Sequence, residues 1–195
     1  MTDDKAGILA DVCAALVANR VQDAVQILSA RYPFTPLHNA GRRYSPRQLI
    51  AVHRRDGFVD RYTGRRLVFP GTLRLLAQLL PKQFPFHPNW RTDACHFAFY
   101  ELFPTIDHIV PVSRGGSDSF ENWVTTSMLR NAAKANFMLG ELNWFVHPPG
   151  DLQQWDGLTT WFLDWAAKHK GILTDAYLRR WHDAARSTTL DAFAT

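Results

Sequence analysis

Five polar side chains follow one another between positions 107 and 134, and together they could hydrolyse a phosphodiester bond. They are Asp107, His108, Asn122, Asn131 and Lys134. A neutral imidazole can deprotonate a water molecule. Carboxylate and amide oxygens are hard ligands, which suit Mg²⁺ or Mn²⁺ held by few protein groups. Hydrolysis of a phosphodiester needs both an activated water and a positive charge, because the transition state and the departing oxygen are anionic.

The order and spacing of these residues resemble the HNH, or ββα-metal, nuclease motif. The Asp-His pair is followed by a Gly-Gly turn at 115–116, by an Asn fourteen residues after the His, and by an Asn/Lys pair on the next predicted helix. The spacing is also similar to that in the HNH domain of RNA-guided CRISPR nucleases. The resemblance covers about residues 104–137. Taken singly, each residue has a commoner structural explanation, but five matches in one strand-loop-strand-helix unit favour a nuclease site.

The resemblance implies a role for each position. His108 would be the general base, and Asp107 and Asn131 would bind a single Mg²⁺ or Mn²⁺. Asn122 would bond across the loop between the two strands and hold the histidine ring in position, a supporting role that commonly matters nearly as much as the ligands. The products would carry a 5′-phosphate and a 3′-hydroxyl.

Many family members hold this unit together with a structural zinc bound by two Cys-x-x-Cys pairs, and neither pair is present. The four thiolate positions fall on Asp60, Thr63, Ser127 and Arg130. We therefore expect no structural zinc. An ion pair between Asp60 and Arg130, with hydrogen bonds from Thr63 and Ser127, is expected to replace it. Because such a zinc serves folding, its loss would leave catalysis intact.

Positive charge is concentrated in residues 42–91, which hold eleven Lys and Arg residues against two acids, whereas the whole chain has a net charge of +4. Ten of the eleven are Arg, whose planar guanidinium suits phosphate. A polyanion is therefore a candidate partner, and the resemblance implies that it is DNA, expected to be double-stranded. The residues expected to contact its phosphates are Arg54, Arg55, Arg61, Arg65, Arg66, Arg114 and Lys134. Composition alone leaves a set of solvated surface charges equally open.

The elements that must position the site follow from apolar periodicity, caps and breakers. Apolar residues at helical spacing predict a helical hairpin over 4–31, and Ser45-Pro46 predicts the start of a short helix that ends at Gly57. Strands are expected at 58–60, 66–69, 105–110 and 123–126, and further helices at 72–80, 92–102, 127–140, 158–170 and 174–187.

Length and composition are typical of one folded globular unit: 195 residues, 46% hydrophobic and 21% charged. The apolar runs are too short to span a bilayer and the acidic start does not look like a signal peptide, so a cytoplasmic protein is expected. We predict an α+β fold with a ββα-metal (HNH) core within 42–145, flanked by helical extensions at 1–41 and 146–195. Cys13 and Cys95 are expected to be packed core thiols.

These expectations describe a metal-dependent HNH endonuclease that acts on DNA, a class common in restriction and phage defence. A non-cleaving DNA-binding or regulatory module stays open as an alternative, although the complete set of Asp107, His108 and Asn131 argues against it. An RNA-directed HNH nuclease also stays open, because the missing aromatic ribonucleoprotein signature is weak evidence. A homodimer could pair two single-strand sites, but the sequence has no diagnostic dimer surface.

Overall fold

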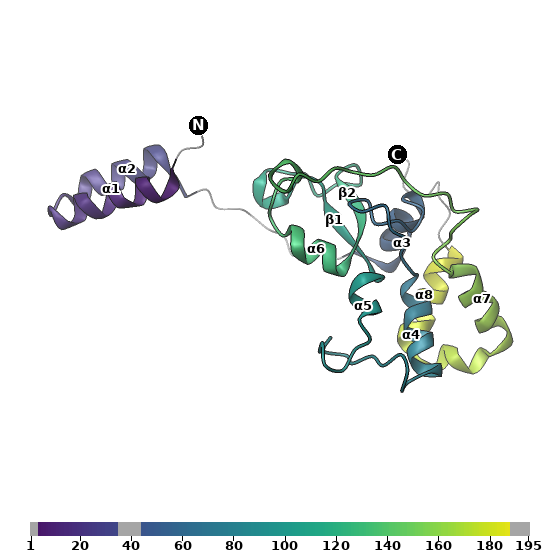
Figure 1. Ribbon diagram of the computed structural model, residues 1–195. Coiled ribbons are helices and arrows are strands. Elements are labelled where there is room, and N and C mark those ends of the chain that lie inside the picture. Colours follow the sequence, from purple (N-terminus) through teal and green to yellow (C-terminus); the bar gives the residue numbers. More distant parts are fainter. Residues whose placement is uncertain (1–3, 35–43, 188–195) are drawn as a thin grey trace. The chain divides into compact units, whose positions relative to one another are not determined.

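The computed structural model describes residues 4–34 and 44–187 (Figure 1). Contacts divide the chain into two units, Met1–Arg42 and Arg43–Thr195. This division differs from the single globular unit that the sequence predicts, because the N-terminal helices bury residues against each other in a small core of their own. The first two arginines of the basic segment, Arg42 and Arg43, lie outside the described residues.

The first unit is the predicted helical hairpin, with α1 (Lys5–Val17) and α2 (Val21–Arg31). The Asp4 carboxylate caps α1 by accepting a hydrogen bond from the Ala6 amide. The residues packed between the helices are Val12, Ala15, Ala24 and Ile27. Cys13 is exposed, so the prediction that it is a packed core thiol is wrong. Its position follows Val12 by one residue, which turns it away from the α1–α2 contact.

The second unit mixes helices with one small sheet, which confirms the α+β class. Its helices are α3 (Pro46–Arg55), α4 (Pro70–Leu79), α5 (Ala98–Glu101), α6 (Met128–Lys134), α7 (Thr159–Lys168) and α8 (Ala176–Ser187). Its strands are β1 (Pro104–His108) and β2 (Trp123–Ser127), and short 3₁₀ turns lie at η1 (Val112–Arg114), η2 (Leu139–Leu142) and η3 (Lys170–Thr174).

The two strands and the helix after them occur in the predicted order. β1 and β2 are antiparallel, with Pro104 opposite Ser127 and His108 opposite Trp123. Ser127 ends β2 and caps α6, because its hydroxyl accepts the Arg130 amide at 3.2 Å. α6 is shorter than the predicted helix, since Ala135 takes a φ of +45° directly after Lys134 and so ends it.

Three predicted elements are largely replaced by turns. The strands at 58–60 and 66–69 reduce to one isolated bridge between Val59 and Arg66, because Phe58 has a φ of +48° and a turn begins at Asp60. The helix predicted over 92–102 is limited to α5, and the preceding residues form turns. Cys95 is buried in that segment, as expected of a packed thiol, and its sulfur accepts the His87 amide.

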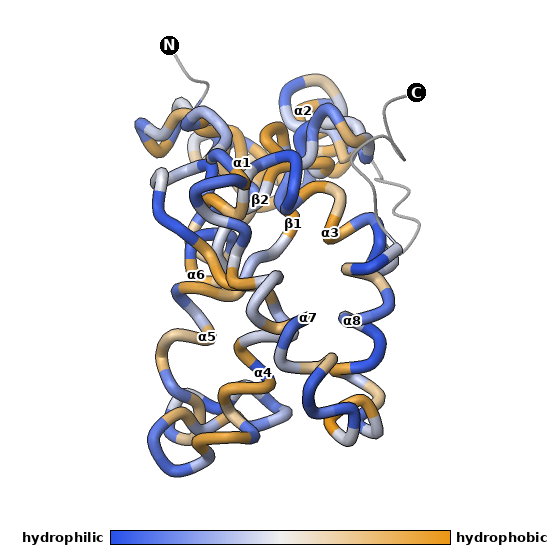
Figure 2. Tube along the Cα trace, turned by 90° about the vertical axis from the view of Figure 1, so that its right-hand side faces the viewer, coloured by the Kyte–Doolittle hydropathy of each residue, from blue (hydrophilic) through white to orange (hydrophobic). Residues whose placement is uncertain are grey.

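Packing joins the C-terminal helices to α3 and α4 in one core. Its fully or nearly fully buried members include Ile50, Phe58, Phe69, Leu75, Phe162, Leu178 and Trp181. α4 is largely hydrophobic, whereas α8 is largely hydrophilic and buries one face (Figure 2). A second cluster of Val52, Ile106 and Trp123 fixes α3 against the sheet that carries the candidate site. In the part of the chain that the structure describes, no helix is both long and apolar enough to cross a bilayer.

Candidate active site

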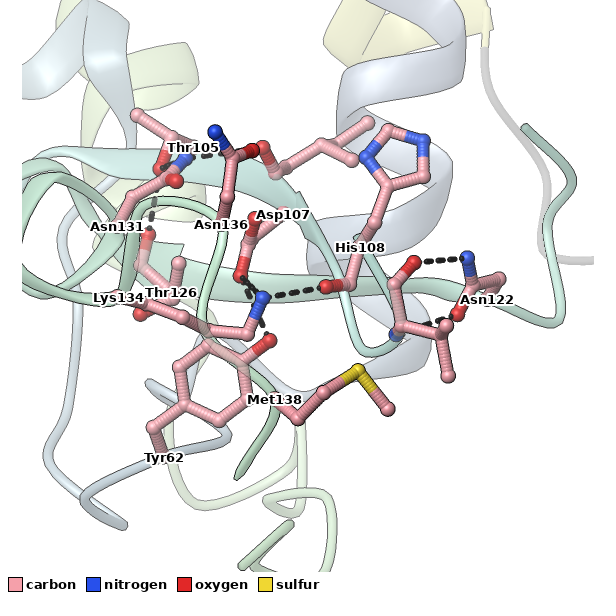
Figure 3. Close-up of polar contacts among 12 residues, drawn as sticks. Tyr62, Thr105, Asp107, His108, Asn122, Thr126, Asn131, Lys134, Asn136 and Met138 are labelled. Carbon is pink, nitrogen blue, oxygen red and sulfur yellow. Dashed lines mark hydrogen bonds and ion pairs between the residues drawn. The ribbon is translucent and has the colours of Figure 1, made fainter. Parts of the chain in front are cut away.

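Asp107 lies at the end of β1, where its carboxylate is buried among polar partners (Figure 3). Its Oδ2 accepts a hydrogen bond from the Tyr62 hydroxyl at 2.7 Å and forms an ion pair with Lys134 Nζ at 2.9 Å. Burial and the neighbouring Asp107 carboxylate raise the pKa of Tyr62 above its usual value, so the phenol stays a donor. Tyr62 was not predicted as a site residue, although it belongs to the Tyr-Thr-Gly turn of the basic segment.

Lys134 does not lie where the sequence places it. The side chain is fully buried, and its ammonium donates to the His108 carbonyl oxygen at 2.7 Å as well as pairing with Asp107. The prediction that Lys134 contacts a flanking phosphate is therefore wrong for this conformation. The last turn of α6 points the side chain inward, and its charge balances a buried carboxylate.

Asn131 is fixed on α6 by its amide nitrogen. Nδ2 donates to the Thr105 hydroxyl at 3.0 Å and to the Ile106 carbonyl at 3.1 Å, in the peptide group just before Asp107. Within residues 4–34 and 44–187, the second carboxylate oxygen of Asp107 and the amide oxygen of Asn131 accept no hydrogen bond. These are hard oxygen donors on adjacent elements, and they fit a divalent cation that keeps several waters.

His108 projects from the neighbouring position of β1 and is also buried. Its Nε2 lies 2.8 Å from Asp118 Oδ1. The Trp123 indole donates to the same carboxylate oxygen at 2.8 Å and lies 3.2 Å from His108 Nε2, and the Tyr44 hydroxyl donates to Asp118 at 3.1 Å. The ring is thus positioned by Asp118 and two aromatic residues.

Asp118 was not predicted, and its environment favours the charged carboxylate. Partial burial alone would raise its pKa, but hydrogen bonds from His108, Trp123 and Tyr44 together bring the pKa of Asp118 below its usual value. The only signal in the sequence is an acid just after the Gly-Gly-Ser turn, in the loop between the two strands.

Asn122 makes the predicted bonds across that loop. Its Oδ1 accepts the Val110 amide at 2.9 Å, and its Nδ2 donates to the carbonyls of Val110 at 2.9 Å and Ser117 at 2.7 Å. Gly116 is required at this crossing, because a β-carbon there would lie 1.9 Å from the Val110 oxygen. Asn122 therefore holds the loop that carries Asp118, and Asp118 contacts the histidine ring.

The four positions expected to replace a zinc site are arranged differently from the prediction. No ion pair joins Asp60 and Arg130 among the described residues. The buried Asp60 carboxylate instead accepts the amides of Tyr62 and Ser127 and the Thr126 hydroxyl, at 2.9, 3.0 and 3.1 Å. The Arg130 guanidinium lies 4.7 Å from the centre of the Trp144 ring, and the Thr63 hydroxyl accepts the Arg65 amide. The Asp60 carboxylate thus connects the turn at 60–64 to the end of β2. Backbone amides and a hydroxyl satisfy it, so no arginine has to be buried beside it.

Two of the predicted phosphate-binding arginines are used to balance a buried acid. Asp56 is fully buried and pairs with Arg61 at 2.6 Å and Arg55 at 3.0 Å, and it accepts the Thr125 amide at 2.7 Å. Both arginines also donate to backbone carbonyls. Their assignment to DNA phosphates is wrong in this structure, since their charge and donors are occupied inside the fold.

The other predicted basic contacts fall into two groups. Arg54 is half-buried, donates to the Ala185 carbonyl at 2.8 Å and has its pKa lowered mainly by burial, so it also serves the fold. Arg65 and Arg66 are exposed, and Arg66 lies 5.1 Å from the Trp155 ring centre. Arg114 makes an exposed two-point ion pair with Glu141, at 3.0 and 3.2 Å. An exposed pair of this kind is weak enough to exchange for a phosphate.

Comparison with known proteins gives one match. Residues 99–138 match a family model described as HNH endonuclease, over α5, both strands and α6. No curated protein and no solved structure matches the chain. The matched segment contains Asp107, His108, Asn122, Asn131 and Lys134, whose spacing alone predicts this motif. Residues 99–138 of this chain thus match the HNH endonuclease family.

Proposed function

We propose that the protein is a metal-dependent endonuclease that hydrolyses double-stranded DNA, with residues 42–145 as its nuclease core. The observation that carries the proposal is the arrangement at the end of β1. There, an imidazole that contacts a carboxylate lies one residue from Asp107, and Asp107 and Asn131 each have an oxygen that accepts no hydrogen bond from the described part of the chain. A general base and two hard ligands are the groups that phosphodiester hydrolysis requires.

His108 is the proposed general base. Asp118 Oδ1 and the Trp123 indole both contact Nε2 and hold the ring in the position from which it takes a proton from water. The same carboxylate then stabilises the imidazolium that forms, and Trp123 keeps the two groups in line. Asn122 acts one step further away, by holding the loop from which Asp118 projects.

Asp107 and Asn131 are the residues that would hold Mg²⁺, or Mn²⁺. When bound, such an ion stabilises the negative charge on the scissile phosphate and on the leaving 3′-oxygen. Asn131 is kept in place by Thr105 and Ile106, while Tyr62 and Lys134 orient the Asp107 carboxylate from its other oxygen. Structural zinc has no role in this proposal, since Asp60 connects the turn at 60–64 to the start of α6.

The proposed substrate contacts are three exposed cations of the second unit, Arg65, Arg66 and Arg114. They would bind backbone phosphates and so give affinity without base specificity. A cytoplasmic role in restriction or phage defence is the setting that we propose, because intracellular DNA would be the substrate there.

Cleavage of supercoiled plasmid by the purified protein tests this function. We expect conversion to nicked or linear plasmid with Mg²⁺ or Mn²⁺, none with EDTA, and none with His108→Ala, whose DNA binding should persist. His169→Ala is the matched control, because His169 is exposed on the C-terminal helices and should leave cleavage unchanged. Full activity of His108→Ala would refute the base assignment, and cleavage of RNA but not DNA would support the RNA-directed alternative.

A further inference from the structure

The helical hairpin of the first unit exposes more large apolar side chains than its small core accounts for. Exposed members are Leu9, Leu16, Val17, Val21, Val25, Leu28, Tyr32 and Phe34, with Val17 86% and Phe34 90% exposed. The buried members are few and mostly small. Short helices in water are only marginally stable unless they bury an apolar face. The hairpin therefore has a second apolar face that a partner would bury.

The exposed residues are spaced as a second packing seam. On α1 the buried residues Ile8, Val12 and Ala15 are separated by four and three positions, and the row beside it, Leu9, Cys13 and Leu16, repeats this spacing. On α2 and its C-cap, the exposed Val21, Val25, Leu28 and Tyr32 are separated by four, three and four positions. Alternation of three and four is the pattern of helices packed side by side in a bundle. Each helix is therefore built for two helical neighbours, and the hairpin supplies one.

Charge on the hairpin is balanced and complementary between its two helices. Residues 4–34 hold three acids, Asp4, Asp11 and Asp23, and three bases, Lys5, Arg20 and Arg31. α1 with its cap carries a net charge of −1, and α2 with its cap carries +1. Ion pairs Arg31–Asp11 and Arg20–Asp23 lie within the hairpin. Three acids and three bases leave the hairpin without net charge, so a polyanion gains little from it and a second copy of the hairpin meets no net repulsion.

We propose that this face binds the same face of a second copy of the chain, so that two hairpins form a four-helix bundle. Two copies related by a twofold axis are the smallest closed assembly that gives every helix its second neighbour. A hollow of about 430 Å³ at the end of α2, lined by Val25, Leu28, Ser29, Tyr32, Pro33 and Phe34, continues the apolar seam and offers space for side chains of the partner copy.

The oligomeric state of the full chain, measured by light scattering without DNA or metal, tests the proposal. Wild type should have twice the mass of the chain, and Leu16→Asp/Val25→Asp should have the mass of one chain. Gln26→Asp is the matched control, because Gln26 is exposed on α2 away from both seams and should leave the dimer intact. A monomeric wild type, or a dimer that survives the seam substitutions, would overturn the proposal.

Cross-linking provides a second measurement that needs no destabilising variant. Cys13 is exposed on the proposed seam and Cys95 is buried. A flexible bismaleimide should therefore link two wild-type chains and fail to link Cys13→Ser. A dimeric wild type that cannot be linked through Cys13 would place the interface elsewhere and overturn the proposal.

The dimer should also affect how many DNA strands are cut, an effect that rests on the proposed nuclease function. Two joined sites should cut both strands, so wild type should give linear plasmid and the seam variant mainly nicked plasmid. Mass and activity separate the two proposals, because His108→Ala should stay dimeric.

Discussion

Single residues in the candidate site combine catalytic chemistry with the balancing of buried charge. Lys134 shows this best, since its buried ammonium contacts the Asp107 carboxylate and the His108 carbonyl at once. Breaking such a pair leaves the other charge uncompensated. The lysine therefore holds both members of the Asp-His pair in register while leaving the second Asp107 oxygen open.

We expect Asp118 to support His108 as the general base. Asp118→Asn should lower the cleavage rate about 10- to 100-fold, the usual cost of losing a supporting carboxylate, because an amide has no negative charge with which to stabilise the imidazolium. Unfolding free energy should change little, since the side chain is 42% exposed. Glu121→Gln, an exposed acid of the same loop, is the control. Equal rates for the two variants would contradict the role of Asp118.

His53 predicts a pH dependence of stability. Burial lowers its pKa from 6.5 to about 3, and its Nδ1 contacts the Thr125 hydroxyl at 3.1 Å. The unfolded chain therefore binds the proton more tightly, and stability is lost as pH falls from 6.5 towards 3. Between about pH 7.5 and about pH 5 we expect a loss of about 2 kcal/mol in unfolding free energy from this residue.

Urea unfolding at the two pH values, for wild type and His53→Gln, measures this effect. The variant should show a pH dependence smaller by that amount, because glutamine does not titrate, while the other histidines contribute equally to both proteins. Parallel pH profiles would show that His53 is not the source.

Elements were predictable where local signals act alone. The Ser45-Pro46 cap correctly predicts α3, and apolar periodicity predicts both hairpin helices and both C-terminal helices. The 58–69 hairpin was not predictable, because the buried Asp60 draws the chain into a turn towards Ser127. That contact spans 67 positions in sequence, and no local propensity contains it.

The same contact gives a prediction for how elements are connected. Asp60→Ala removes three hydrogen bonds, two of which join the turn to the end of β2, and we expect a loss of about 3 kcal/mol in unfolding free energy. Arg130→Ala should cost under about 1 kcal/mol, because within residues 4–34 and 44–187 the guanidinium contributes a ring contact and no ion pair. Thermal and urea unfolding of both variants measure this difference. An equal cost for the two would restore the ion pair that the sequence suggested.

For the whole molecule, the composition gives the number of charged side chains but not whether each one faces solvent or the interior. The residues of the family motif, Asp107, His108, Asn122 and Asn131, lie around one strand end and the loop that follows it. The basic segment misleads, since Arg55 and Arg61 turn inward to a buried acid whose partners lie far along the chain. Asp118 and Tyr62 escape prediction for the same reason: their roles depend on tertiary contacts with His108 and Asp107.

The positive charge of solvent-exposed side chains should therefore decide DNA affinity. Arg65→Ala/Arg66→Ala should weaken binding to a DNA duplex and reduce the slope of log affinity against log salt by about 2, one unit for each lost phosphate contact. The folded state should be nearly unaffected, because both side chains are exposed. Fluorescence anisotropy over a salt series, in the His108→Ala background to prevent cleavage, measures the slope. Lys168→Ala/Lys170→Ala removes the same charge from an exposed site on the C-terminal helices and should leave the slope unchanged. Equal slopes for the two double variants would mean that DNA follows another surface of the nuclease unit.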